Sequence, residues 1–192
     1  MVLLTALSTT ALGVARYGDG LDLVPSSECG GWDTLGTGSV LVTQTDTLEW
    51  RLLHEFSADG LLTGSSWEEE SSSSRSSTRL LEVSDESAIL ESQDPGGGCL
   101  VTEGQVSLRP EAASGQLVNE AENRQVTVPA GTFLCRYRWI RTDSFQDVET
   151  WTVPSLPIPI QTVVTWRTGA PGGVPSSRRT VLVSIDRRPA AD

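Results

Sequence analysis

The dominant pattern along the chain is an alternation of apolar and polar residues with a period of two. Residues 48–56 place one set of side chains on a common face: Leu48, Trp50, Leu52, His54 and Phe56. Glu49, Arg51 and Glu55 fall on the opposite face, so this segment predicts a half-buried β-strand. The same alternation predicts strands over 132–141, 160–167 and 180–186.

Weaker strand patterns fill most of the remaining chain, between turn signals such as Asp59-Gly60 and Ala130-Gly131. They cover 38–44, 61–68, 78–84, 87–92, 99–108, 125–128 and 147–153. About ten short strands predict an all-β fold, either one antiparallel sheet curled into a half-barrel or open barrel, or two packed sheets. Residues 109–123 are rich enough in Glu and Ala for one short helix, although Gly115 interrupts it.

Two segments are expected to lie outside regular structure. Ser71–Ser77, which follows Glu68–Glu70, is a low-complexity run typical of a solvated hairpin loop or of the frayed ends of two strands. Residues 187–192 are expected to form a disordered tail. We find no internal repeat or linker, and we therefore expect residues 16–186 to form a single β domain.

The N-terminal residues resemble a secretion signal. Residues 2–15 are apolar or small and uncharged, and they end in the small-x-small pattern Gly13-Val14-Ala15. The usual cationic leading segment is missing, so we interpret 1–15 as a truncated signal peptide; a first buried strand or short helix is the alternative. The run is too short to span a membrane, and no later stretch is long enough either. A signal peptide at 1–15 predicts that the protein is exported, and therefore periplasmic or secreted.

The three cysteines fit an exported protein. Cys29 and Cys99 lie in glycine-rich segments, whereas Cys135 lies on the apolar face of a strand. One disulfide and one buried thiol is the simplest arrangement, and of the three pairings we favour Cys29–Cys99. The alternative is that all three are reduced core residues.

Charge narrows the classes of partner. The chain has 192 residues and a net charge of -11, and all 14 of its cationic residues are Arg. It should therefore repel nucleic acid and anionic membranes. Residues 1–96 carry a net charge of -12 and residues 97–192 a net charge of +1. Acidic and Arg-rich strands that lie side by side would neutralise each other; an Arg-bearing surface for an anionic partner is the alternative.

No constellation of residues indicates catalysis. His54 is the only histidine, and a histidine on an apolar strand face is more typical of a core or pocket wall than of a general base. A zinc site would need His54 and all three cysteines, with no Cys-x-x-Cys pair to begin it. We therefore predict no catalytic residue, no metal and no cofactor.

The aromatic residues are the best candidates for a binding site. Together with His54 they form the predicted ligand-binding set: Trp50, His54, Phe56, Phe133, Tyr137, Trp139, Trp151 and Trp166. In a tightly filled sheet these side chains are core. In an open barrel the same inward faces line an apolar cavity for lipid or another hydrophobic ligand.

One stretch resembles a known group of proteins. The sequence Val-Thr-Val-Pro-Ala-Gly-Thr-Phe at 126–133 leads into a second strand, then a strand with Trp151 and a Val-rich strand at 162–166. This succession resembles bacterial extracytoplasmic half-barrel proteins of unknown function with the fold of the lipoprotein carrier LolA, over residues 124–186. Ser155–Ile160 replaces the glycine usual in that pattern. The resemblance implies a curved antiparallel sheet with a concave apolar face, and it implies no catalytic residues.

Three functional hypotheses follow. The leading one is a non-catalytic extracytoplasmic β-protein that binds a hydrophobic small molecule, a lipid or a lipidated protein in a concave apolar face. The second is an envelope interaction or structural module with a filled core. The third is a small half-barrel enzyme that uses His54 or a carboxylate. The pattern leaves the oligomeric state open.

Overall fold

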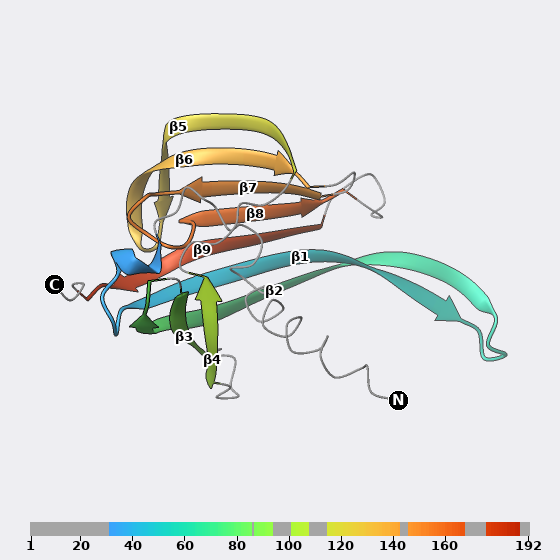
Figure 1. Ribbon diagram of the computed structural model, residues 1–192. Coiled ribbons are helices and arrows are strands. Elements are labelled where there is room, and N and C mark those ends of the chain that lie inside the picture. Colours follow the sequence, from blue (N-terminus) through green and yellow to red (C-terminus); the bar gives the residue numbers. More distant parts are fainter. Residues whose placement is uncertain are drawn as a thin grey trace, which may run out of the picture.

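The computed structural model describes residues 31–85, 87–93, 101–107, 115–142, 146–167 and 176–188. Over these residues the chain is all-β apart from one 3-10 turn, η1 (Trp32–Thr34). The strands are β1 (Val40–Phe56), β2 (Leu62–Val83), β3 (Ser87–Gln93), β4 (Val101–Ser107), β5 (Gln116–Val128), β6 (Gly131–Arg141), β7 (Gln146–Thr152), β8 (Gln161–Trp166) and β9 (Ser176–Asp186). They form one nine-stranded antiparallel sheet, which confirms the predicted all-β class (Figure 1).

The sheet joins two meanders through the first and last strands. Its order is β4-β3-β2-β1-β9-β8-β7-β6-β5, so β1 pairs with β9 in the middle, and β4 and β5 form the edges. Ser107 ends β4 and Gln116 begins β5. The intervening chain reaches about 30 Å at most. In a flat nine-stranded sheet, the two edge strands β4 and β5 would lie about 38 Å apart. The sheet must therefore curl, and it does so without closing into a barrel.

Most buried side chains lie on one face of the sheet, which we call the buried face. In its middle, residues directly opposite each other on β1, β9, β8 and β7 are all threonines: Thr45, Thr180, Thr162 and Thr150. The Thr45 and Thr180 hydroxyl oxygens are 3.0 Å apart. Short β-branched side chains suit such close cross-strand packing, and paired hydroxyls satisfy one another. The middle of the buried face is thus filled by small side chains.

The main apolar core lies toward one end of this face. Leu41, Leu80, Leu90 and Leu182 come from four strands, and Trp32 of η1 packs with them. The connection between β7 and β8 adds its own buried residues, Val153, Leu156, Ile158 and Ile160. Burial of these side chains is the main stabilising term for the domain. It fixes the β1–β2 hairpin at its base.

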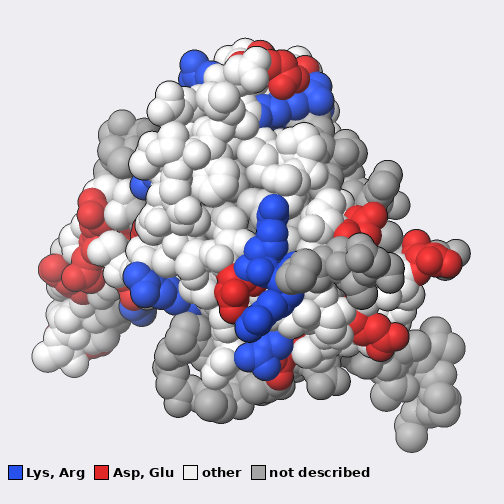
Figure 2. All heavy atoms as spheres, turned by 90° about the vertical axis from the view of Figure 1, so that its left-hand side faces the viewer, with Lys and Arg blue, Asp and Glu red and all other residues white. Residues whose placement is uncertain are grey.

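Several charged side chains of the sheet form ion pairs with near neighbours. Arg136 contacts Glu120 at 2.8 Å, and Arg141 contacts Asp147 at 3.1 Å, all within the C-terminal meander. On the end of the molecule shown in Figure 2, cations and acids also lie close to one another. The acidic and Arg-rich halves adjoin where Asp46 of β1 lies opposite Arg179 of β9, whose Nη2 donates to Gln161 Oε1 at 2.8 Å. Exposed ion pairs such as Arg136–Glu120 contribute little to stability.

Several expectations about individual segments need correction. The separate strands predicted at 38–44 and 48–56 are parts of one strand, β1, and those predicted at 61–68 and 78–84 are parts of β2. Ser71–Ser77 is neither a loop nor a frayed end, because it lies within β2 and is paired with β1 along its whole length. The predicted helix is wrong for residues 116–123, which belong to β5.

Other expectations fall outside the described residues or at their limit. Residues 1–15, Cys29 and Cys99 lie outside, so the signal peptide and the disulfide stay predictions. Arg187 and Arg188, where we expected a disordered tail to begin, are hydrogen-bonded. Arg188 donates its backbone N–H to Ser39 Oγ at 2.9 Å, and Arg187 Nη2 donates to the Ser155 carbonyl at 2.8 Å.

Candidate functional site on the β1–β2 arm

The long hairpin of β1 and β2 extends past the rest of the sheet. Leu48 is the last residue of β1 that pairs with β9, and β2 pairs with β3 only from Ser77 onward. Within the described part of the chain, residues 49–56 and 62–70 therefore form a ribbon of two strands, closed by the turn at 57–61. We call residues 49–70 the arm; Figure 1 shows it projecting beyond the other strands.

The turn at the tip of the arm is the predicted one. Ser57 donates its N–H to the Leu61 carbonyl at 2.8 Å, and Gly60 donates to the Ser57 carbonyl at 2.9 Å. Gly60 has a φ of 76°, a conformation that glycine adopts without strain. Asp59-Gly60 thus closes the hairpin.

One face of the arm is apolar, and we call it the arm face. Leu52 lies opposite Trp67, and Phe56 lies opposite Leu62. Phe56 is 64% exposed and Leu62 is 58% exposed, while Leu52 and Trp67 are also classed as exposed. His54 shares this face, where its Nδ1 lies 3.0 Å from Ser65 Oγ. The arm face thus carries two exposed apolar pairs with the His54–Ser65 pair between them, and exposed apolar surface of this kind typically marks a binding site.

The arm face lies on the opposite side of β1 from the buried face. At the base of β1, the buried side chains are Leu41, Thr43 and Thr45, at odd positions. In the arm, Trp50, Leu52 and Phe56 of β1 stand at even positions, and the pairing with β2 runs without a register shift up to Glu55. The predicted shared face of residues 48–56 is confirmed, but its predicted burial is wrong for Leu52, His54 and Phe56, which are exposed.

The eight residues of the predicted binding set do not surround one space. Trp50, His54 and Phe56 lie along the arm, whereas the other five lie on β6, β7 and β8. Tyr137 and Trp151 are in contact, with ring centroids 5.0 Å apart. The remaining positions are Phe133 and Trp139 on β6, and Trp166 on β8, which packs against Val148 and Val164. Sequence reasoning missed Leu62 and Trp67, although their segment was predicted to be a strand.

Tyr137 is an aromatic residue whose pKa is strongly raised. Burial raises the pKa of its phenol, and the adjacent Glu149 carboxylate raises it further. Tyr137 donates its hydroxyl to Glu149 Oε2 at 2.7 Å, and the Arg124 guanidinium lies 5.5 Å from its ring centroid. The phenol is therefore neutral over the ordinary pH range and acts as a hydrogen-bond donor.

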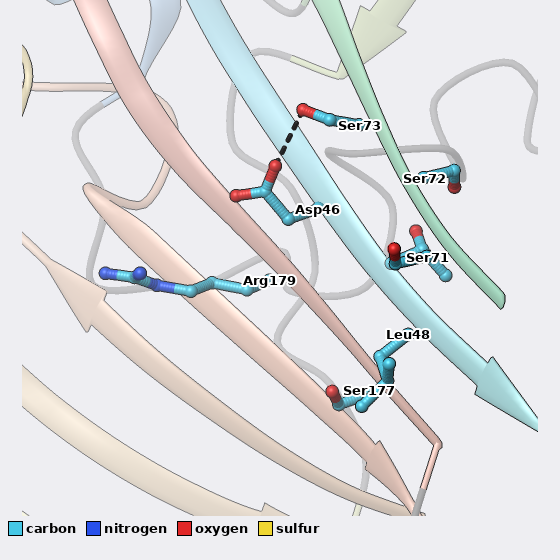
Figure 3. A pocket seen from close by; sticks show the side chains of 8 residues that line it. Asp46, Leu48, Ser71, Ser72, Ser73, Ser177 and Arg179 are labelled. Carbon is cyan, nitrogen blue, oxygen red and sulfur yellow. Dashed lines mark hydrogen bonds between the residues drawn. The ribbon is translucent and has the colours of Figure 1, made fainter. Parts of the chain in front are cut away.

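A groove of about 430 Å³ lies at the base of the arm, between β1, β2 and β9 (Figure 3). Its lining residues are Asp46, Thr47, Leu48, Ser71, Ser72, Ser73, Ser177 and Arg179. Asp46 Oδ1 accepts hydrogen bonds from Gln44 Nε2 at 3.0 Å and from Ser73 Oγ at 2.7 Å. These two bonds lower the pKa of Asp46, so this carboxylate is ionised at neutral pH. The groove presents serine hydroxyl groups and one carboxylate, and the lowered pKa of Asp46 makes it a weak general base toward Ser73.

Cys135 is a buried free thiol, as predicted from its place on an apolar strand face. Burial raises its pKa to about 11, so it is protonated and unreactive at neutral pH. Among the described residues, no group of three or more His, Cys, Asp or Glu side chains is arranged to hold a metal ion. In that same part of the chain, no helix has the length and apolarity needed to cross a membrane.

Comparison of this chain with protein-family models, curated proteins and solved structures gave no match. The likeness to LolA-type half-barrels therefore stays a prediction from residues 124–186.

Proposed function

We propose that this protein is a non-catalytic binding protein that holds an apolar partner on the arm face. The observation that supports this most directly is the exposure of Phe56, Leu62, Leu52 and Trp67 on one side of a projecting ribbon. Exposing apolar area in this way gives up the free energy that its burial would supply, about 25 cal/mol per Å². A partner that covers the face recovers that free energy.

The chemistry of the arm favours a neutral or cationic partner. Residues 49–70 contain six acidic residues and one arginine. Anionic lipid surfaces are therefore repelled. A hydrophobic small molecule, an uncharged lipid chain or the acyl group of a lipidated protein fits this combination of apolar face and acidic surround.

The arm, rather than the curve of the sheet, is the proposed place for this partner. The buried face is occupied by the threonine row and by Leu and Val side chains that pack against one another. The same filled face favours a second candidate, an interaction module with a packed core that meets another protein through its surface.

The test uses the neutral apolar dye Nile red, since an anionic dye would be repelled by the arm. The double variant Phe56→Ser/Leu62→Ser should bind Nile red about tenfold more weakly than the unmodified protein, a loss of about 1.4 kcal/mol. The matched control is Leu117→Ser/Leu134→Ser, which removes two exposed leucines from β5 and β6. Fluorescence titration gives the three dissociation constants.

The control should leave Nile red affinity within about twofold of the original value, well below one tenfold step. Equal losses in the two double variants would show that the dye binds exposed leucine anywhere, and would overturn the proposal. Absence of saturable dye binding in the unmodified protein would reject an apolar ligand and leave the interaction module.

A further inference from the structure

Within the residues that the structure describes, one β-edge of the arm has no partner strand, on the side where the pairing with β9 has stopped. Among the described residues, none pairs with Glu49–Phe56 on that side, because the β1–β9 pairing ends at Leu48 opposite Ser177. An unpaired strand edge is a template for another strand. We propose that two copies of this chain pair through this edge, antiparallel, about a two-fold axis that passes through Leu53. This inference rests on the proposed role of the arm as the binding element.

The symmetry restricts which residue lies on the axis. In an antiparallel pair, the backbone N–H and C=O groups of two directly opposed residues either both point toward the other strand or both point away from it. These two arrangements alternate from residue to residue along a strand. In a two-fold pair of identical strands, opposed residues must therefore be an even number of positions apart. The axis passes through a residue, and near the middle of the free edge the choices are 51, 52, 53 and 54.

Charge selects Leu53 from these choices. With Leu53 on the axis, Arg51 of each copy lies opposite Glu55 of the other, which gives two pairs of opposite charges. With Leu52 on the axis, Glu49 would face Glu55 of the second copy, and with Arg51 on the axis, Arg51 would face itself. Like charges directly opposite each other destabilise a strand pair, whereas opposite charges stabilise it. An axis through His54 places no residue of one copy opposite a residue of opposite charge in the other.

The same register also matches the apolar side chains and the length of the arm. On the arm face, Trp50 of each copy lies opposite Phe56 of the other. The paired strands overlap by seven residues, Trp50–Phe56, or about 24 Å. The tip of one arm thereby reaches the point where the other copy's β9 pairing ends. The two ribbons become a four-stranded sheet with one continuous arm face, and such a sheet is more stable than an isolated hairpin.

The outer edge of β2 is a poorer choice for self-pairing. It carries Glu68, Glu69 and Glu70 in succession, all exposed. An axis at Glu69 would place Glu68 opposite Glu70 of the second copy and Glu69 opposite itself. The β1 edge is therefore the one whose charges are complementary to its own copy.

The first experiment is site-specific disulfide cross-linking of the full chain with oxidised glutathione. Leu53→Cys places two thiols directly opposite each other on the axis, about 5 Å apart at Cβ, within reach of a disulfide. Glu49→Cys is the matched control, because residue 49 takes part in neither charge pair and its two copies lie eight residues apart along the strands, about 27 Å. Leu53→Cys should give a covalent dimer of twice 20.6 kDa well above the amount formed by the unmodified chain, and Glu49→Cys should not. Equal cross-linking in both variants, or none in either, overturns the register.

The second experiment exchanges the charges and measures the dimer dissociation constant by sedimentation equilibrium. Glu55→Arg should weaken the dimer about tenfold, and Arg51→Glu/Glu55→Arg should return it to within about threefold of the original value. Glu49→Arg, which makes the same change of charge opposite Ser57 of the second copy, should leave the dimer nearly unchanged. Failure of the double variant to restore the dimer, or an equal loss from Glu49→Arg, contradicts the proposal. Cooperative thermal unfolding of each variant shows that it is folded.

Nile red binding separates this inference from the proposed function. If Leu53→Cys does not cross-link but the protein binds the dye on the arm face, the dimer is wrong and the apolar site stands. If Leu53→Cys cross-links and no dye binds, the dimer stands and the apolar ligand is rejected.

Discussion

Replacing Leu80 with alanine is expected to lower the free energy of unfolding by about 3 kcal/mol, within the range for leucine deletions in close-packed cores. Leu80 is 0% exposed and lies opposite Leu90 on β3. Its backbone also fixes the start of β1, because Leu80 N–H donates to the Ser39 carbonyl at 2.9 Å and its carbonyl accepts from Gly38 N–H at 2.7 Å. The variant leaves a cavity where β1, β2 and β3 meet. Urea unfolding monitored by tryptophan fluorescence measures the loss.

The matched control is Leu134→Ala, the same change at a side chain that is 66% exposed. It should cost less than about 0.5 kcal/mol, as surface substitutions usually do. A similar loss in both variants would mean that the core at the base of the hairpin is not a main source of stability.

Local alternation was enough to predict most strands and the all-β class. It succeeded best where one face is buried and the other is solvated, as in β6 through β9. It failed for Ser71–Ser77, because a run of serines carries no periodicity. That segment is a strand because β1 supplies its backbone partners: Leu48 lies opposite Ser71 and Thr43 lies opposite Ser76. Long-range pairing overrode local composition there.

The error at residues 116–123 has a related cause. Glu and Ala have high helix propensity, but propensity is a weak prior that tertiary context overrides. Here β6 supplies the pairing for Gln116–Val128, and the bulge between Ala121 and Arg124 accommodates Asn123 at a φ of 56°. Neither the partner strand nor the bulge can be seen in the local pattern.

The candidate site shows the limit of period-two reasoning most clearly. The sequence predicts that Trp50, His54 and Phe56 share a face, and they do. Which face is buried depends on where the pairing of β1 with β9 stops, at Leu48, and β9 lies more than 120 residues later in the chain. Beyond that point the apolar side of β1 projects into solvent. A pattern that predicts a cavity wall in a closed sheet predicts an exposed surface in a projecting ribbon.

Alkaline pH is expected to destabilise the protein through Cys135. The thiol pKa is raised from 9.0 to about 11 by burial, so the folded protein retains this proton while the unfolded chain loses it. The stabilisation from the neutral buried thiol is complete below pH 9 and is lost as the pH rises through 11. Two pKa units correspond to about 3 kcal/mol. Tyr137, whose pKa is also raised, contributes at still higher pH.

Cys135→Ala removes this dependence and isolates it from every other titrating group. At pH 7.5 the variant should be about 1 kcal/mol less stable than the original protein, because it loses one buried sulfur atom. By pH 11 the order of stability should reverse and the variant should be the more stable protein. Only the original protein must keep the Cys135 thiol protonated in order to fold. Urea midpoints at pH 7.5, 9, 10 and 11, in the presence of reductant, follow the crossing. Parallel curves over this range would show that the thiol is not buried in the folded state.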